Sequence, residues 1–260
     1  MPTAVLNGID LYYETTGDTG PTVVFLHGAG GNHLSWWQQV PTFSDHYRCI
    51  AIDHRGFGGS TDPSAEGTTR FADDLEALLA QLGDERVALV AQSMGGRTAS
   101  EFALRHPERV WALVMCDTLG NFVWEELQPR RDQLREERLA RAGEGGVILR
   151  GYMAPGFIAR ERERTFLYQQ VQGLNQPRDA SAPAPAATRE QLAAFPVPTL
   201  FIVGDEDPVV APEIVREVHA LIPGAEYREF PGAGHSVYWE QPGEFNEALA
   251  AFLGRHAGSG

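Results

Sequence analysis

The stretch from Val87 to Gly96, Val-Ala-Leu-Val-Ala-Gln-Ser-Met-Gly-Gly, constrains the fold more than any other part of the chain. Its first half, Val87–Ala91, is short and apolar, which is typical of a strand covered on both faces. After Ser93, apolar residues recur at helical spacing until His106-Pro107 ends the pattern. The stretch therefore predicts a buried strand, a tight turn at Ser93 and a helix.

Ser93 lies where such a turn pushes a side chain out of the sheet. The N–H groups of the first helical turn have no partner within the helix, so they face whatever the hydroxyl attacks. The residues two before and two after the serine, Ala91 and Gly95, are small, as a sharp turn requires. The usual pattern is Gly-x-Ser-x-Gly, and Ala91 departs from it. Taken alone, the motif also fits a strand-helix connection with an unreactive serine.

Strands and helices alternate on both sides of this turn. Their alternation predicts an α/β fold in which helices flank a mostly parallel central sheet of about eight strands. Two alternating runs around Asn7-Gly8 indicate a hairpin that adds antiparallel strands at one edge. Further strand patterns cover residues 22–27, 47–53, 110–116, 198–203 and 226–230, and helix patterns cover 33–43, 71–82, 212–221 and 242–255.

The alternation is interrupted between Thr118 and Phe195. This segment holds two arginine-rich helical stretches, at about 124–141 and 158–174, and a Pro/Ala-rich linker at 177–187. We expect residues 1–117 and 196–260 to form one core domain, with residues 118–195 inserted as a helical cap over the strand ends.

Composition excludes several functions. A formal net charge of −14 makes nucleic acids and anionic membrane surfaces poor partners. All 21 basic residues are arginine, so the lysine of a P-loop or of a pyridoxal phosphate site is absent. The glycine loop Gly28–Gly31 follows a strand, but the dinucleotide pattern fails at His33. No His/Cys/Asp cluster has metal-ligand spacing, so we expect no metal and no organic cofactor.

Cys49 and Cys116 lie within apolar strand patterns and are predicted to be buried thiols. No basic region followed by an apolar run begins the chain, and no stretch approaches the length of a membrane-spanning helix. We therefore expect a cytoplasmic protein, monomeric or homodimeric, whose partner is a small-molecule substrate.

Chemically reactive side chains follow four of the predicted strands. They are His27, Ser93, Asp207 and His235. The carboxyl ends of parallel strands open onto one edge of a sheet, so we expect these side chains to meet there. A serine hydroxyl needs an imidazole to take its proton, and the imidazole needs a carboxylate to hold its tautomer. The order Ser, Asp, His is that of a nucleophile elbow on this kind of sheet.

These motifs resemble those of the α/β-hydrolase superfamily. The matching segments are His27-Gly-Ala-Gly, Asp53-His-Arg-Gly-Phe-Gly-Gly-Ser60, Ala91-Gln-Ser-Met-Gly-Gly96, Gly204-Asp-Glu-Asp-Pro208 and Gly232-Ala-Gly-His235, in the family's order over nearly the whole chain. The resemblance implies that Ser93 is the nucleophile, His235 the general base and acid, and Asp207 the orienting acid. It also implies an oxyanion hole formed by the backbone N–H groups of Ala29 and Met94, and a cap domain.

The acid has competitors. Asp205 and Glu206 adjoin Asp207, and Asp117 ends a sheet strand from which some superfamily members take their acid. Asp207 is preferred because Pro208 can fix the loop just beyond it.

A serine at the turn disfavours epoxide opening and halide displacement, because relatives with those activities use a carboxylate there. The favoured reaction is cleavage of a hydrophobic ester or lactone through an acyl-enzyme. The predicted pocket is apolar, although some of its members would simply anchor the cap. Its residues are Trp36, Trp37, Phe122, Trp124, Tyr152, Phe157, Val237 and Tyr238. Three alternatives remain: a C–C bond hydrolase, a cofactor-free perhydrolase with the same triad, and a non-catalytic small-molecule receptor.

Overall fold

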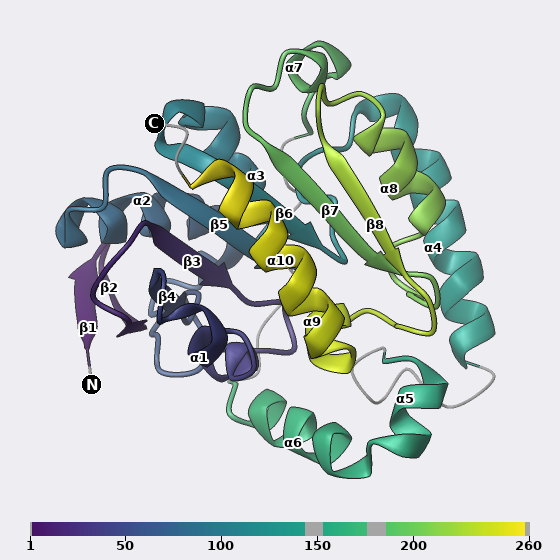
Figure 1. The fold of residues 1–260 in the computed structure, drawn as a ribbon, viewed down its shortest axis with the longest axis horizontal. Helices are drawn as coiled ribbons and strands as arrows, with labels where there is room; N and C mark the ends of the chain where they lie inside the picture. The colour runs from purple at the N-terminus through teal and green to yellow at the C-terminus, as the bar shows by residue number, and fades with distance from the viewer. Residues whose placement is uncertain (1, 144–152, 176–185, 258–260) are drawn as a thin grey trace.

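The computed structural model describes residues 2–143, 153–175 and 186–257. Its strands are β1 (Thr3–Leu6), β2 (Ile9–Thr16), β3 (Thr22–Leu26), β4 (Arg48–Ile52), β5 (Val87–Gln92), β6 (Val110–Cys116), β7 (Thr199–Gly204) and β8 (Glu226–Phe230). They form an eight-stranded sheet in the order β1-β2-β4-β3-β5-β6-β7-β8 (Figure 1). β2 pairs antiparallel with β1 and β4, and the remaining neighbours are parallel. The prediction of a mostly parallel α/β sheet is confirmed.

The predicted hairpin joins β1 to β2. Asn7 and Gly8 both have positive φ, at 45° and 76°, and Leu6 pairs with Ile9 across the turn. Positive φ at both central residues defines the turn type whose twist matches that of the flanking strands, and an Asn-Gly pair adopts it at low cost. The hairpin therefore adds antiparallel strands at the N-terminal edge of the sheet, as expected.

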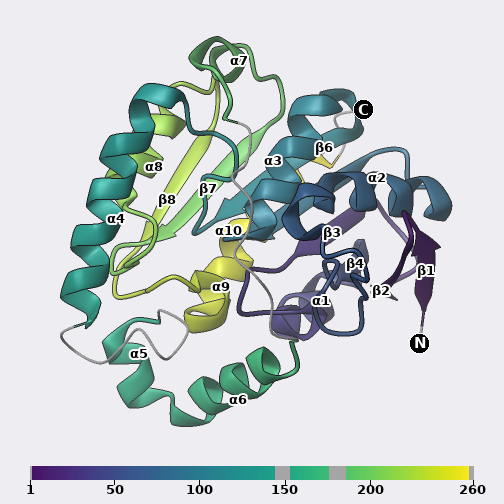
Figure 2. The ribbon, with the colours of Figure 1, turned by 180° about the vertical axis from the view of Figure 1, so that it is seen from behind.

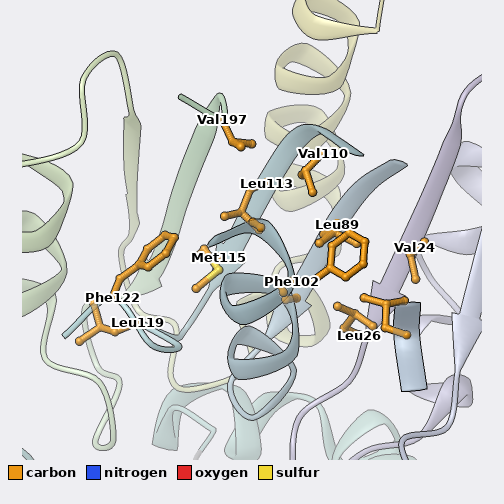
Figure 3. Close-up of a cluster of buried hydrophobic side chains, with 14 of the residues drawn as sticks. Val24, Leu26, Leu89, Phe102, Val110, Leu113, Met115, Leu119, Phe122 and Val197 are labelled. Atoms are coloured by element: carbon orange, nitrogen blue, oxygen red, sulfur yellow. The ribbon is translucent and has the colours of Figure 1, made fainter. Parts of the chain in front are cut away.

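Helices cover both faces of the sheet (Figures 1 and 2). α2 (Phe71–Leu82), α3 (Gly95–Arg105) and α8 (Pro212–His219) pack on one face, and α1 (Val40–Phe43) and α10 (Pro242–His256) pack on the other. Successive side chains of β3 alternate between the two cores: Val24 enters the α2/α3/α8 core, shown in Figure 3, and Phe25 enters the α1/α10 core. Because both faces are covered, the central strands are apolar throughout.

The helix predicted at 33–43 is instead two short pieces. The 3-10 helix η1 (His33–Trp36) is capped by the side chain of Asn32, which accepts the N–H of Leu34 at 3.0 Å. α1 follows, with Pro41 in its first turn. Proline donates no backbone hydrogen bond, so it is accommodated at a helix start but would interrupt one continuous helix.

The segment between β6 and β7 is helical, as predicted, but more divided. Its elements are the 3-10 helix η4 (Glu125–Leu127), α4 (Gln128–Gly143), α5 (Pro155–Arg160), α6 (Arg162–Gly173) and α7 (Arg189–Ala193). The predicted helix at 158–174 is broken at Glu161, where ψ is 59°. Most of the predicted linker at 177–187 lies outside the described residues. The short helices η2 (Gly67–Thr69), η3 (Pro107–Arg109) and α9 (Val237–Glu240) were not predicted.

α6 lies against the loops that follow the strands. The side-chain amide of Asn32, after β3, donates to the carbonyl of Val171 at 3.0 Å, and the indole N–H of Trp239 donates to the carbonyl of Arg164 at 3.2 Å. α4 runs beside α8, and their side chains meet in an ion pair between Arg130 and Glu217 (Figure 1). Of the inserted helices, α6 thus packs where the carboxyl ends of the parallel strands lie, whereas α7 lies at the opposite end of the sheet, just before β7 begins (Figure 1).

Candidate active site

Ser93 occupies a strained turn between β5 and α3. Its φ is +47°, a left-handed conformation that costs a residue with a side chain roughly 1–2 kcal/mol. Both of its backbone groups are paired with the end of β6: its N–H donates to the carbonyl of Cys116 at 3.1 Å, and its carbonyl accepts from Thr118 Oγ1 at 2.7 Å. These bonds hold the backbone in the strained conformation, and the Ser93 residue is partly exposed rather than buried.

Close packing explains the small residues around the turn. A Cβ atom on Gly95 would lie 2.2 Å from the carbonyl oxygen of Leu26, and one on Gly96 would lie 2.4 Å from the side chain of Thr118. Both glycines therefore let α3 start directly against its neighbours. Ala91, the departure from the usual glycine, is fully buried in the α2/α3/α8 core, where its methyl group is accommodated.

Ser93, His235 and Asp207 form a continuous line of hydrogen bonds. His235 Nε2 is 2.8 Å from Ser93 Oγ, and His235 Nδ1 is 2.8 Å from Asp207 Oδ2. The second oxygen of Asp207 accepts the N–H groups of Val209 and Val210 at 2.7 and 2.9 Å. With both ring nitrogens and both carboxylate oxygens engaged, the imidazole is fixed between the hydroxyl and the acid.

The environment of His235 makes it a stronger base. Burial opposes the charged imidazolium, but the negative charge of Asp207 and the hydrogen bond to it outweigh burial and raise the pKa of His235 above its ordinary value. Asp117 and Glu240 add to the rise in that pKa through their charges. The imidazole is therefore suited to take a proton from Ser93 and to carry the resulting charge.

Asp117 bonds to the loops around the imidazole. Its carboxylate accepts the N–H groups of Gly204 at 3.1 Å and of Val237 at 3.0 Å, and it also accepts the thiol proton of Cys116. Burial, followed by the charge of Asp207, raises the pKa of Asp117 to about 7. Within the described residues, the carboxylate hydrogen-bonded to the His235 ring is that of Asp207.

The other two competitors for the acid, Asp205 and Glu206, are exposed. Asp205 accepts the N–H of Gly232 at 2.7 Å. Asp207, by contrast, is fully buried.

The two segments that would supply the oxyanion hole lie beside Ser93. A Cβ atom on Gly28 would be 3.2 Å from Ser93 Cβ, so the backbone entering Ala29 passes directly by Ser93. His27 supports this loop: its Nε2 accepts the N–H of His54 at 3.0 Å, so its Nδ1 carries the proton and donates to the Gly28 carbonyl at 2.8 Å. Met94 directly precedes α3 on the other side of the serine. The N–H groups of Ala29 and Met94 remain our proposal for the oxyanion donors.

Several predicted pocket residues belong to or adjoin the α1/α10 side of the molecule. Trp36 is buried between Phe25 and Tyr238, with ring centroids 5.3 and 4.5 Å away. Trp37 is 44% exposed. Phe157 and Val237 are buried in the same core as Trp36.

Phe122 and Trp124 lie in the core on the opposite face of the sheet. Phe122, labelled in Figure 3, packs edge-on against Phe195 at 5.0 Å between centroids, and the guanidinium of Arg189 lies 4.8 Å over Trp124. The structure therefore does not bring these two side chains together with Trp36 and Tyr238, and it places them where they anchor the inserted segment. Tyr152 lies outside the described residues.

Three side chains near the site were not singled out from sequence. Glu240 accepts backbone N–H groups of the loop that carries His235. Arg138 of α4 donates to the backbone carbonyls of Asp207 at 2.7 Å and of Asp205 at 2.6 Å. Asn175 donates to the carbonyl of Gly31 at 3.0 Å. The contacts of Arg138 and Asn175 join the inserted segment to loops of the site, and no local pattern of residues marks them.

Other predicted features can also be placed. Cys49 and Cys116 are free and buried, as predicted. Among the described residues, no group of three or more His, Cys, Asp or Glu residues is placed to hold a metal ion, and no helix has the length and apolar character needed to cross a membrane.

Comparison with known proteins identifies the family of this chain. A family model for the alpha/beta hydrolase fold matches residues 21–144 and 150–242. The chain belongs to the alpha/beta hydrolase family. The predicted resemblance is thereby confirmed.

Relatives of this hydrolase differ in activity. A putative 2-succinyl-6-hydroxy-2,4-cyclohexadiene-1-carboxylate synthase of Bacillus subtilis strain 168 is 31% identical, covering 91% of this chain and 93% of its own. A solved N-acyl homoserine lactone degrading enzyme superposes with a TM-score of 0.79 at 29% identity, covering 96% of this chain and all of its own. A bromoperoxidase from Bacillus anthracis superposes with a TM-score of 0.80 at 28% identity, covering 97% and 99% of the two chains.

Proposed function

We propose that this alpha/beta hydrolase cleaves carboxylic esters or lactones of small to medium hydrophobic substrates through an acyl-enzyme. One observation carries the proposal: His235 is hydrogen-bonded on one side to the hydroxyl of Ser93 and on the other to Asp207, each at 2.8 Å. This arrangement activates a serine for attack on a carbonyl carbon.

In the first half of the reaction, Ser93 Oγ attacks the carbonyl carbon of the substrate while His235 Nε2 takes its proton. Asp207 holds the other ring nitrogen and stabilises the imidazolium by its charge. The N–H groups of Ala29 and Met94 would donate to the negative oxygen of the tetrahedral intermediate, a contribution worth roughly a hundredfold or more in rate for one donor.

The imidazolium then protonates the leaving alcohol, which departs and leaves the acyl group on Ser93. In the second half, His235 takes a proton from water, the hydroxide attacks the acyl carbon, and the imidazolium returns the proton to Ser93. For a lactone, the alcohol and the acid stay within one product molecule. The partly exposed Ser93 is consistent with access of a substrate from solvent.

The apolar side chains near the site support a hydrophobic substrate. We propose that Trp36, Trp37, Phe157, Val237 and Tyr238 bound its pocket, and that residues 118–195 act as a cap whose geometry selects the substrate. The likeness to a lactone-degrading enzyme supports lactones as members of the substrate class.

Perhydrolysis is a second candidate, because a bromoperoxidase is among the similar structures. Here hydrogen peroxide replaces water in the second half: the acyl group moves from Ser93 to the peroxide, which yields a peracid, and the proton returns through His235 to the serine. The same triad serves both reactions. They differ only in whether water or hydrogen peroxide takes the acyl group from Ser93.

A substrate panel tests the proposal. Purified protein is incubated with p-nitrophenyl esters, simple lactones and a vinylogous diketone, and with a fluorophosphonate that labels activated serines. We expect ester or lactone hydrolysis together with stoichiometric labelling of Ser93. Labelling without turnover of any ester or lactone would reject the esterase assignment, turnover of the diketone alone would indicate a C–C bond hydrolase, and absence of labelling would reject the activated serine.

A further inference from the structure

The loop that carries His235 is held by a buried side chain outside the triad. Glu240, the last residue of α9, is only 4% exposed. Its carboxylate accepts the N–H of Gly234 at 3.1 Å to each oxygen, and Oε1 accepts the N–H of Ser236 at 3.3 Å. The two backbone donors on either side of His235 in the chain therefore both end on Glu240.

The same carboxylate also bonds to the inserted segment. Oε2 accepts the N–H of Ala154 at 2.9 Å, and Ala154 is the residue just before α5. Glu240 thus joins a loop of the active site to a helix that comes from a different part of the chain. The His235 loop is secured from the other direction by Gln92, whose side-chain amide donates to the His235 carbonyl at 2.7 Å.

Stability alone is a poor explanation for a carboxylate at this place. Burial raises the pKa of Glu240 to about 7, against the opposing effect of its three N–H donors. A buried carboxylate is costly to desolvate, and an apolar side chain of similar size commonly stabilises a fold as well or better. An apolar side chain, however, cannot accept hydrogen bonds from the backbone N–H groups of Ala154, Gly234 and Ser236.

Small displacements of the imidazole have large effects on a reaction of this kind. His235 must meet Ser93 and Asp207 at hydrogen-bond distance simultaneously, and a shift of about 1 Å at a reacting group can lower a rate about a hundredfold. We propose that Glu240 is a positioning residue, which fixes the His235 imidazole against Ser93 by holding Gly234 and Ser236. Because Glu240 also accepts from Ala154, the position of the imidazole depends on how α5 packs against this loop. The inference rests on the proposed function of the triad.

The test compares Glu240→Gln with Glu247→Gln, which neutralises an exposed glutamate on α10. Glutamine keeps one acceptor but turns an amide NH₂ toward the backbone donors, so the loop loses part of its anchorage. We expect a folded Glu240→Gln protein in which kcat falls about tenfold to a hundredfold while KM changes less than about threefold. We also expect the same fall in the rate of fluorophosphonate labelling and a shifted or broadened downfield proton resonance of His235 Nδ1–H. Glu247→Gln should match the wild type in all four measurements.

A Glu240→Gln protein with a native melting curve and with wild-type kcat, labelling rate and resonance would overturn the inference. If Glu240→Gln does not fold, Glu240→Asp keeps the charge but shortens its reach, and the same fall in labelling rate is expected; an unchanged rate in that variant would overturn the inference. Labelling and the resonance require no ester, so they test Glu240 even if the substrate class is wrong. The esterase proposal fails separately, on the substrate panel with the wild-type protein.

Discussion

The backbone N–H of Ser93 donates to the carbonyl of Cys116 at 3.1 Å, which ties the turn after β5 to the end of the neighbouring strand β6. This bond, with the one from Thr118 Oγ1 to the Ser93 carbonyl, holds Ser93 at a φ of +47°. The fold therefore bears a local conformational cost at Ser93, whose hydroxyl is hydrogen-bonded to His235, as is common at functional sites.

Replacing Ser93 should separate activity from stability. Ser93→Ala removes the nucleophile and should lower turnover at least about a thousandfold, with no fluorophosphonate labelling. Ser93→Gly should be equally inactive but more stable than Ser93→Ala by about 1 kcal/mol, because glycine adopts positive φ without strain. Urea unfolding of both variants measures the difference, with the exposed Ser64→Ala as the control. Equal stability of the two variants would mean that the turn is not strained, and retained activity in Ser93→Ala would refute the nucleophile.

Asparagine substitutions distinguish Asp207 from Asp117 as the acid. Asp207→Asn keeps the size of the side chain but loses the charge and can favour the wrong imidazole tautomer, so kcat should fall roughly ten-thousandfold. Asp117→Asn keeps one acceptor oxygen and so loses one of the two bonds to the N–H groups of Gly204 and Val237. It leaves the carboxylate that touches the ring unchanged, so the fall in kcat should stay within about tenfold. Steady-state kinetics on one ester measures both. The reverse ranking would transfer the role of acid to Asp117.

The pH dependence of activity follows from the base. His235 accepts the serine proton only when neutral, and its pKa is raised, so kcat/KM should fall with decreasing pH in a limb centred above pH 6.5. The carboxylates that raise this pKa are Asp207, Asp117 and Glu240. The residual activity of Asp207→Asn should show the limb at lower pH, because the largest of these charges is gone. A pH-rate profile from pH 5 to 9 measures both, and an unshifted limb in the variant would contradict the electrostatic coupling.

How much of this site could be predicted depends on where each interaction lies. Ser93, Asp207 and His235 each follow a strand, and parallel topology brings strand ends together whatever the intervening distance, so their convergence could be inferred from residue order. Glu240 and Asn175 act on backbone atoms up to 144 positions away, and residue type encodes nothing about such contacts. For the same reason the aromatic character of Phe122, predicted to bound the pocket, gave no indication of the face of the sheet on which it lies.

Asp117 should make the protein less stable as the pH rises. Its pKa is raised from 3.8 to about 7, so the folded state binds its proton more tightly than the unfolded state does. The contribution of Asp117 to stability is fully present below pH 3.8 and is lost as the pH rises through about 7. Asp117→Asn has no such group, so the stability of the wild type relative to this variant should decrease between pH 4 and 7. Denaturant unfolding at several pH values measures it, with the exposed Glu244→Gln as control. A relative stability that rises with pH would reverse the assigned direction.

Asn175, just after α6, should support the proposed oxyanion hole. Its side-chain amide donates to the Gly31 carbonyl at 3.0 Å, and its oxygen accepts the N–H of Gly58 at 3.1 Å, so one side chain joins the loop after β3 to the loop after β4. Asn175→Ala frees both loops and should displace the N–H of Ala29, which lies just before the tethered residues. We expect kcat to fall about tenfold, with little change in KM for an ester whose oxyanion forms only in the transition state.

Asn175→Asp provides the sharper comparison. The carboxylate can still accept from Gly58, but it has no N–H for Gly31 and instead places a negative charge beside that carbonyl. It should therefore be at least as slow as Asn175→Ala, and a transition-state analogue should bind both variants more weakly by the same factor as the loss in kcat/KM. Gln170→Ala, an exposed amide on α6, is the matched control. If Asn175→Asp retains wild-type kcat and analogue affinity, the bond to Gly31 does not position the oxyanion donor, and α6 is joined to this loop for packing alone.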